Sequence, residues 1–405
     1  MSTSNATPVH QKSRAAAVSW LIVPAFACVL ALTACTEHKP PATNEAAQPA
    51  APSAAKQDGG AQRVLNFYDW ADYIDPAVLT QFEKETGVHV RYDTFDSSEM
   101  LETKLLTGHT DYDVVVTSAN ILSRQVAAGA LRKLDLDAIA NRRNLDPALV
   151  ALLDPSDPGG AHAVPYLLAT TGIGLNLDQV EKRIPGGTPD SWRLVLDPKS
   201  AAKLADCGLA VLDSPTDTIA NVLLYLGYDP DKADAAQMRA AEKVLMSIRP
   251  YVRYINSEKQ VADLASGEIC ATIGWSGDIA NARARAEAAG KPQRLRFVIP
   301  REGAISLSDM LAIPVDAPHV ADAHRLIDYL LRADIGAQNA NFVGYASPNL
   351  AAMPLIEERL RKDPGIYPPP AVKAKLHAMP ARTLEMTRIE TRLWTHFRMG
   401  TEPSG

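Results

Sequence analysis

The fold is decided by residues 63–118, which read RVLNFYDWADYIDPAVLTQFEKETGVHVRYDTFDSSEMLETKLLTGHTDYDVVVTS. The run at 63–68 has the residue types of a short first strand. A helix signal follows directly, because Asp75 can cap a helix, Pro76 suits its first turn and Gly87 can end it. The stretch therefore begins as a strand followed by a helix.

The same alternation repeats immediately downstream. Residues 88–92 predict a second strand, and Ser97 or Ser98 can cap a helix that stops at Gly108. Residues 113–116 read Asp-Val-Val-Val, a run that is apolar after its first residue, as expected at the centre of a parallel sheet. This β-α-β-α-β order indicates an α/β domain with a mostly parallel sheet.

The rest of the chain continues this pattern. Further strands are expected at 163–168, 172–175, 209–212, 271–275, 295–299 and 310–313, and helices at 219–226, 235–248 and 320–331. The 405 residues suggest about two domains, and 46% hydrophobic with 22% charged residues is typical of a globular protein. The formal net charge of −6 argues against nucleic acid as a partner, because that needs a clustered basic face.

The N-terminus has the parts of an export signal. Lys12 and Arg14 precede an apolar run at 15–32, and the ending Leu-Thr-Ala-Cys resembles the bacterial lipobox. We therefore expect a lipoprotein signal peptide over residues 1–35, with the lipid on Cys35. A retained transmembrane helix is the alternative, and Pro24 together with the placement of the cysteine favours cleavage.

Residues 36–62 are rich in alanine and proline without periodicity, which predicts a flexible tether. The expected location is the periplasm, with the protein anchored to a membrane by its lipid. Of the four cysteines, Cys28 lies in the signal and Cys35 is the lipid site, which leaves Cys207 and Cys270. A bridge between them would close a loop of about 60 residues and add up to roughly 4 kcal/mol. Two buried free thiols are the alternative.

Motifs for catalysis or metal binding are missing from the sequence. The nine histidines are scattered, the cysteines form no Cys-x-x-Cys, and there is no Gly-x-Ser-x-Gly or phosphate loop. We therefore predict no metal, no cofactor and no catalytic residue. An enzyme with an unmatched motif stays an alternative.

Aromatic and acidic residues gather in six segments at predicted strand-to-helix turns: 68–73, 117–120, 213–217, 274–278, 307–310 and 344–346. In open α/β sheets, ligands bind at the carboxyl ends of strands, where the first four segments are expected. Aromatic faces with carboxylates suit an organic diammonium, since each desolvated cation–π contact adds about 2 kcal/mol and each charge-assisted hydrogen bond about 1.5–3 kcal/mol. Singly, such residues are more often core residues or helix caps.

These residues resemble the periplasmic putrescine- and spermidine-binding proteins of polyamine ABC importers, over about residues 64–394. The resemblance is carried by Phe-Tyr-Asp-Trp-Ala-Asp-Tyr (67–73), Phe-Glu-Lys-Glu-Thr-Gly (82–87), Ala-Thr-Thr-Gly-Ile-Gly (169–174), Ile-Gly-Trp-Ser-Gly-Asp (273–278) and Pro-Gly-Ile-Tyr-Pro-Pro (364–369). It implies two α/β lobes joined by a hinge of crossing strands, each lobe with a mostly parallel sheet. Lobe 1 would comprise 63–168 with 285–318, and lobe 2 would comprise 169–284 with 319–405. It also implies that Cys207 and Cys270 are bridged.

The resemblance further implies a ligand site. The expected aromatic walls are Trp70, Trp275 and Tyr345, and the carboxylates that hold two ammonium groups are Asp278 and Asp309. Acidic or water-mediated contacts are expected from Asp72 and Asp217, and a polar rim from Tyr73, Ser118 and Asn120. Three positions depart from the family: Leu307 replaces an aromatic residue, Ala71 a hydroxyl residue and Asp217 a glutamate. Leu307 implies a weaker wall or a wider pocket.

The implied function is capture of putrescine or a related polyamine, and its delivery by a monomer to an ABC permease with its ATPase. Spermidine or another organic cation is the alternative ligand. A polyamine-sensing role, an enzyme using Asp278 and Asp309 as paired carboxylates, and a purely structural lipoprotein are the alternative functions.

Overall fold

The computed structural model describes residues 63–95, 97–154, 156–187, 189–291 and 293–400. The predicted signal peptide over 1–35, its lipidation site Cys35 and the tether over 36–62 lie outside the described residues. Within the described part of the chain, every helix is too short or too polar to span a bilayer.

The described residues form one ten-stranded mixed sheet. Its strands are β1 (Arg63–Trp70), β2 (Val88–Phe95), β3 (Val114–Ser118), β4 (Ala163–Asn176), β5 (Leu209–Val211), β6 (Val252–Ile255), β7 (Ala271–Trp275), β8 (Leu295–Val298), β9 (Ala304–Ala312) and β10 (Leu376–Ala378). The strand order is β2-β1-β3-β9-β4-β7-β5-β6, with β10 beside β9 and β8 beside β4. The pairs of β1 with β2 and β3, and of β5 with β6 and β7, are parallel. The predicted α/β class is confirmed.

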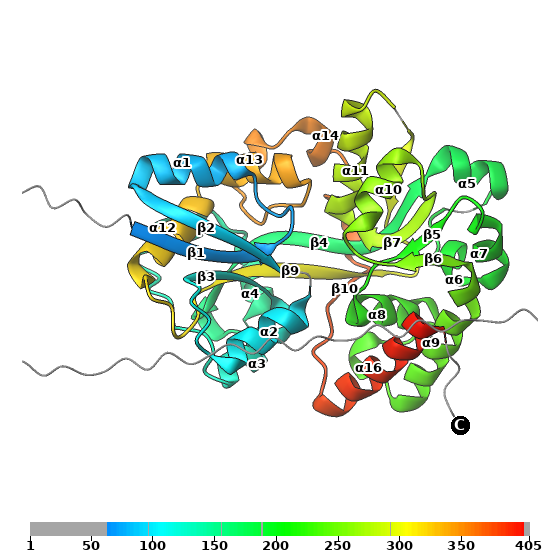
Figure 1. The fold of residues 1–405 in the computed structure, drawn as a ribbon, viewed down its shortest axis with the longest axis horizontal. Coiled ribbons are helices and arrows are strands. Elements are labelled where there is room, and N and C mark those ends of the chain that lie inside the picture. The colour runs from blue at the N-terminus through cyan, green and yellow to red at the C-terminus, as the bar shows by residue number, and fades with distance from the viewer. Residues whose placement is uncertain (1–62, 96, 155, 188, 292, 401–405) are drawn as a thin grey trace, which may run out of the picture. The chain divides into compact units, whose positions relative to one another are not determined.

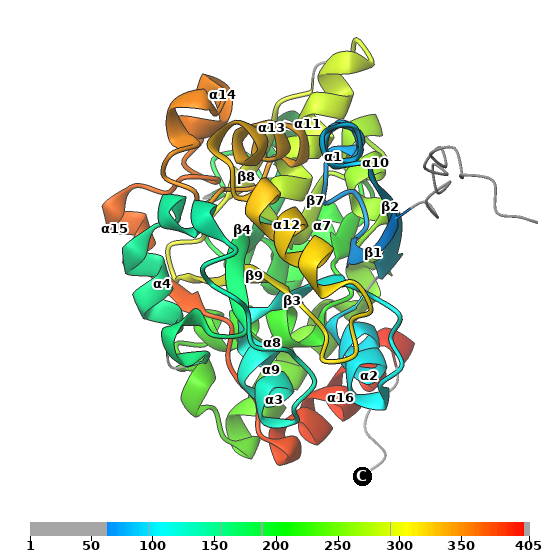
Figure 2. The same cartoon turned by 90° about the vertical axis from the view of Figure 1, so that its left-hand side faces the viewer.

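Helices follow most strands, as Figures 1 and 2 show. The α-helices are α1 (Pro76–Thr86), α2 (Ser98–Thr107), α3 (Ala119–Ala127), α4 (Pro147–Leu153), α5 (Leu177–Arg183), α6 (Arg193–Leu196), α7 (Pro198–Leu204), α8 (Pro215–Tyr225), α9 (Ala235–Ile248), α10 (Lys259–Ser266), α11 (Ser276–Ala288), α12 (Val320–Leu330), α13 (Ala333–Val343), α14 (Glu358–Arg361), α15 (Pro370–Lys373) and α16 (Leu384–Met399). The 3₁₀ turns are η1 (Ala140–Asn144), η2 (Pro158–Gly160), η3 (Pro230–Lys232), η4 (Arg249–Tyr251) and η5 (Met353–Leu355).

The first strand–helix units form as the sequence predicts. Asp75 accepts a hydrogen bond from the Ala77 amide at 2.9 Å and caps α1, which ends at Gly87 with φ of +71°. Ser97 caps α2 in the same way, accepting from the Met100 amide at 3.2 Å. These local interactions fix the direction in which the chain returns to each next strand.

Both faces of the β1–β3 strands are covered by helices. Leu65 and Phe67 of β1 pack in one apolar cluster with Phe82 of α1, whereas Tyr68 packs in another with Leu101 of α2. Figure 1 shows α1 and α12 on one side of these strands and α2 and α3 on the other. The alternation of side chains along β1 therefore explains why both faces are apolar.

A second core surrounds β5 and β7. Val211 and Ile273 from these strands pack with Leu245 of α9 and Phe397 of α16, and with the fully buried Trp192. Figure 1 shows α16 beside α9. The C-terminal helix thus closes the core of the second set of strands.

β4 connects the two sets of strands. Its residues Ala163–Thr170 pair antiparallel with β9, and Thr171–Leu175 pair antiparallel with β7. The sequence predicted two extended stretches here, and the structure instead has one continuous strand of 14 residues. Backbone pairing on both sides keeps Thr170 and Thr171 extended.

The lobe boundaries stay a prediction. The predicted boundaries place α12 in lobe 2, yet its Leu326 and Ile327 pack in the core cluster of β1. The ring of Tyr329 contacts Phe82 with 5.2 Å between centroids. This packing favours assigning α12 to lobe 1, as a revised proposal.

Three local predictions were wrong. Residues 344–346 were expected at a strand-to-helix turn, but they follow helix α13, whose C-cap is Gly344. Residues 307–310 were expected at a strand-to-helix turn, but they lie inside β9, which begins at Ala304. Pairing with β3 and β4 on either side explains this, because the sequence of 304–309 by itself carries only a weak strand signal. α8 begins at Pro215 instead of Ile219, which places Asp217 in its first turn.

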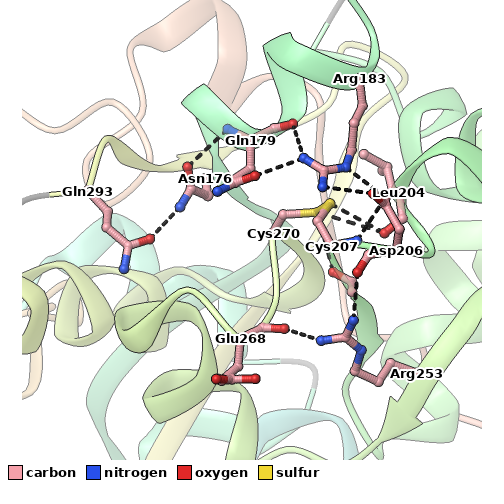
Figure 3. The surroundings of a disulfide bond; sticks show 11 residues. Asn176, Gln179, Arg183, Leu204, Asp206, Cys207, Arg253, Glu268, Cys270 and Gln293 are labelled. Atoms are coloured by element: carbon pink, nitrogen blue, oxygen red, sulfur yellow. Dashed lines mark hydrogen bonds and ion pairs between the residues drawn. A yellow bond between two sulfur atoms is a disulfide. The ribbon is translucent and has the colours of Figure 1, made fainter.

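The bridge between Cys207 and Cys270 is confirmed. Cys270 is fully buried at the edge of the second core, next to β7. Figure 3 shows the neighbouring ion pair of Arg183 with Asp206, and Arg253 donating to the backbone carbonyls of Asp206 and Glu268. The bridge thus joins the chain after α7 to the start of β7.

Candidate ligand-binding site

One cavity of about 410 Å³ brings together every residue predicted for the ligand site. Its lining includes Trp70, Asp72, Tyr73, Ser118, Asn120, Asp217, Trp275, Asp278, Asp309 and Tyr345. Their contacts with a ligand stay a prediction.

The ends of parallel strands place most of these side chains. Trp70, Ser118 and Trp275 are the last residues of β1, β3 and β7. Asp217 and Asp278 lie in the first turns of α8 and α11. The cavity thus lies where strand ends and helix N-termini meet, as in other open α/β sheets.

Asp309 projects from the middle of β9 and is only 5% exposed. It accepts hydrogen bonds from the Tyr73 hydroxyl and the Ser118 hydroxyl, each at 2.7 Å. Burial raises the pKa of Asp309 to about 6, and the two hydroxyl donors oppose this rise. The carboxyl group is fixed in place and titrates not far below neutral pH.

Asp278, in the first turn of α11, is also held by hydrogen bonds from neighbouring side chains. It accepts a hydrogen bond from the Tyr345 hydroxyl at 2.7 Å and from Gln260 at 3.3 Å. Gln260 is itself fixed, because it accepts from Thr272 at 2.6 Å. Desolvation raises the pKa of Asp278 to about 6, against the effect of Tyr345 and Gln260. Each of the two carboxylates therefore has its own tyrosine donor.

Asp217 has both carboxylate oxygens engaged by protein groups. Oδ1 accepts from Thr171 and, at 3.4 Å, from the Trp275 indole, and Oδ2 accepts from Ser214 at 2.6 Å. Burial raises its pKa, and these three donors oppose the rise. The arrangement suits a carboxyl group that orients Trp275.

Asp72 lies at the rim of the cavity. Its side chain is 73% exposed and forms an ion pair with Arg285 at 2.9 Å. Its backbone has φ of +56°, which turns the chain sharply between Trp70 and Tyr73. Solvent screening weakens any contribution that this carboxylate makes inside the cavity.

Aromatic rings form the walls. The ring centroids of Trp70 and Trp275 are 6.5 Å apart, and those of Tyr73 and Tyr345 are 4.9 Å apart. A side chain at Gly277 would begin 2.2 Å from the Tyr345 ring, so glycine is what admits this tyrosine. The arrangement presents ring faces and two carboxylates to the same space.

Several lining residues were not predicted from the sequence. They are Phe95, Glu99, Met379, Arg382 and Glu390, among others. Arg382 and Glu390 form a buried ion pair at 2.6 Å. These residues come from β2, α2, the segment entering α16 and α16 itself, where no pattern along the chain marks them.

The three positions that depart from the family, Leu307, Ala71 and Asp217, all line the cavity. Leu307 is 9% exposed. An aliphatic side chain at this place gives apolar contact but no ring face for a cation. No group of three metal-ligating side chains was found within the described ranges.

Chemically, the cavity suits an elongated cation with an apolar middle. Two carboxylates accept hydrogen bonds from its ends. The rings bury its methylene groups, each worth about 0.8 kcal/mol.

Residues 77–368 match the model of a family described as bacterial extracellular solute-binding proteins. The chain is 44% identical to the putrescine-binding periplasmic protein SpuD of Pseudomonas aeruginosa, over 84% of this chain and 92% of that protein. It is 43% identical to the putrescine-binding periplasmic protein PotF of Escherichia coli, over the same shares. Among solved structures, it resembles a putative spermidine/putrescine ABC transporter protein from Listeria monocytogenes. That match has a TM-score of 0.75 at 30% identity, over 83% of this chain and 99% of that one.

Proposed function

The chain belongs to the bacterial extracellular solute-binding protein family, and from this premise we propose that it captures putrescine or a related polyamine. It delivers this cargo, as a monomer, to an ABC-type permease with its ATPase. The named relatives are binding proteins, and the proposed role includes no catalytic step.

One observation carries the choice of ligand. Asp278 and Asp309 lie on one cavity with aromatic walls, and each is held by a tyrosine hydroxyl at 2.7 Å. A diamine places one ammonium at each carboxylate and its methylene chain against the rings. Ligands without cationic ends would leave two desolvated carboxylates unpaired, which disfavours them.

Titration calorimetry of the purified protein tests this function. We expect one putrescine per chain, weaker binding of spermidine, and no heat from a neutral amino acid. Tighter binding of spermidine would be compatible with the transport role but would make spermidine the preferred ligand. Leu307 would then be the first residue to mutate in order to test what sets this preference. No heat with either polyamine would contradict the proposed function.

The affinity for putrescine should depend on pH. Cation binding needs ionised carboxylates, and the pKa of Asp278 and of Asp309 is about 6 in the empty cavity. The contribution of these two carboxylates to affinity is therefore expected to be full well above that value and to fall as pH drops through it. With two groups titrating, the fall should approach about tenfold to a hundredfold per pH unit. Calorimetry at a series of pH values measures this dependence. An affinity that does not change down to about pH 4 would contradict the prediction.

We also propose that the mature protein begins at a lipid-modified Cys35 and is held to a membrane through residues 36–62. Mass spectrometry of the protein from its host membranes should find the first 34 residues removed and a lipid mass on Cys35. The Cys35→Ala variant should lose that mass and leave the membrane fraction. Retention of Met1 in the mature chain would contradict the anchor.

A further inference from the structure

Asp69 is a buried carboxyl group directly beneath the site. It precedes Trp70 in β1 and has no exposed surface. Its Oδ1 accepts a hydrogen bond from the Trp70 amide at 2.7 Å. Its Oδ2 is also buried and has no hydrogen-bond partner among the described residues. A buried carboxylate with an unpartnered oxygen is costly as an anion.

The groups that face Asp69 offer no compensating cation. They are Tyr73 after β1, Tyr92 of β2, Tyr166 of β4 and Asp309 of β9. The tyrosines are neutral, because burial raises the pKa of each above its ordinary value. Within the described ranges, Asp69 takes part in no ion pair. Burial and the negative charge of Asp309 therefore favour the neutral acid, and only the hydrogen bond from the Trp70 amide opposes them.

The pKa of Asp69 is raised, which also favours the neutral acid. Burial raises it well above its ordinary value, the hydrogen bond from the Trp70 amide lowers it, and the charge of Asp309 raises it further. The dependence on Asp309 is important, because Asp309 is one of the two carboxylates proposed to meet the ligand.

Asp69 also belongs to a set of contacts that holds the wall of the cavity. The Trp70 amide donates to Asp69, while the Trp70 carbonyl accepts from the Tyr92 hydroxyl at 2.8 Å. The Tyr73 carbonyl accepts from the Tyr166 hydroxyl at 3.3 Å. Both peptide groups of Trp70 are thus fixed, which orients an indole that lines the cavity.

We propose that Asp69 is a positioning residue that holds Trp70 through one carboxyl oxygen, carries a proton on the other in the empty protein, and releases that proton when a diammonium ligand binds. The inference rests on the proposed function for its ligand. The proton leaves Asp69 as H⁺ to solvent, and no other bond changes. A dication beside Asp309 offsets the charge that opposes ionisation of Asp69.

The sign of the effect follows from this coupling. Ligand binding lowers the raised pKa of Asp69. At a pH between the pKa values of Asp69 in the bound and in the empty protein, binding therefore releases a proton, and affinity rises with pH. Asp278 and Asp309 release protons by the same rule, but mainly around pH 6, where they titrate in the empty protein. At about pH 8 these two are ionised, so the proton release that the proposal assigns to Asp69 is measured there as the difference between the unaltered protein and a variant without this carboxyl group.

The test is calorimetry of the full chain with putrescine at about pH 8, in buffers of different ionisation enthalpy, which counts the protons released. Asp69→Asn keeps an oxygen that can accept from Trp70 and removes the proton. We expect this variant to bind putrescine and to release up to about one proton fewer per chain than the unaltered protein. Asp137→Asn, which alters an exposed aspartate outside the cavity, should release the same number as the unaltered protein.

Infrared spectroscopy provides a second measurement. The empty protein should show the carbonyl band of a protonated carboxylic acid that is lost in Asp69→Asn and weakened by putrescine. Equal proton release by the Asp69→Asn variant and the unaltered protein, or a band that Asp69→Asn does not alter, would overturn the inference. Failure of the unaltered protein to bind putrescine would instead overturn the proposed function, and the infrared band of the empty protein would still decide whether Asp69 carries a proton.

Discussion

Replacing Asp309 with asparagine is expected to weaken putrescine binding by about 30- to 4,000-fold, or 2–5 kcal/mol. The variant keeps the size of the side chain but loses the charge that pairs with an ammonium group. An amide also has only one acceptor oxygen for the two hydroxyl groups of Tyr73 and Ser118, which now both donate to Asp309. Because Asp309 is 5% exposed, water cannot replace the lost partner of the cation.

Titration calorimetry at neutral pH measures this loss. The matched control is again Asp137→Asn, which makes the same chemical change at an exposed position that does not line the cavity. Its affinity should equal that of the unaltered protein. If Asp309→Asn bound putrescine as tightly as the control, the assignment of Asp309 to the ammonium group would be wrong.

Removing the bridge between Cys207 and Cys270 is expected to lower the free energy of unfolding by about 2–4 kcal/mol. The two cysteines are 63 residues apart in sequence, so the unfolded chain gains the freedom of a long loop. Alanine at both positions avoids burying a hydroxyl group where Cys270 has no exposed surface. Urea unfolding of the double variant and the unaltered protein gives the difference.

The effect on binding should be small in the same variant. Neither cysteine lines the cavity, and Figure 3 shows the bridge beside Leu204 and the ion pair of Arg183 with Asp206. Putrescine affinity is expected to stay within about threefold of the unaltered protein, since distant sites are close to additive. Reduction of the unaltered protein should reproduce the lower stability, whereas equal urea midpoints in all three samples would refute the stabilising role.

Much of the fold was predictable from local signals. The helix at Pro76–Thr86 was predicted correctly because its cap, its proline and its terminal glycine all act within the segment. The strand at Ala271–Trp275 and the helix at Ala235–Ile248 were predicted at the bounds observed. β9 was predicted only in part, because its first half is stabilised by β4, a strand from a distant part of the sequence.

The site residues were predictable from two sources, the strand-end rule and the resemblance to a known family. Strand ends carry Trp70 and Trp275, and the rule that ligands bind at carboxyl ends of strands indicates where to look. The resemblance supplied Asp309 and Tyr345, which lie in the middle of a strand and after a helix. Neither source indicated Arg382 and Glu390, whose ion pair becomes part of the cavity only through the packing of α16.

The sequence by itself determined the α/β class and the first strand–helix units, and its resemblance to a known family indicated ten of the residues that line the cavity. The class and the first units depend on periodicity, capping and turn chemistry, which act between residues close together in the chain. The tertiary structure decided which donors hold each carboxylate and how each group titrates. Tyr73 reaches Asp309 across 236 positions of sequence, and Tyr345 reaches Asp278 across 67. Desolvation and hydrogen bonding set a pKa only when such distant groups are buried together, so the state of Asp69 depends on the folded chain.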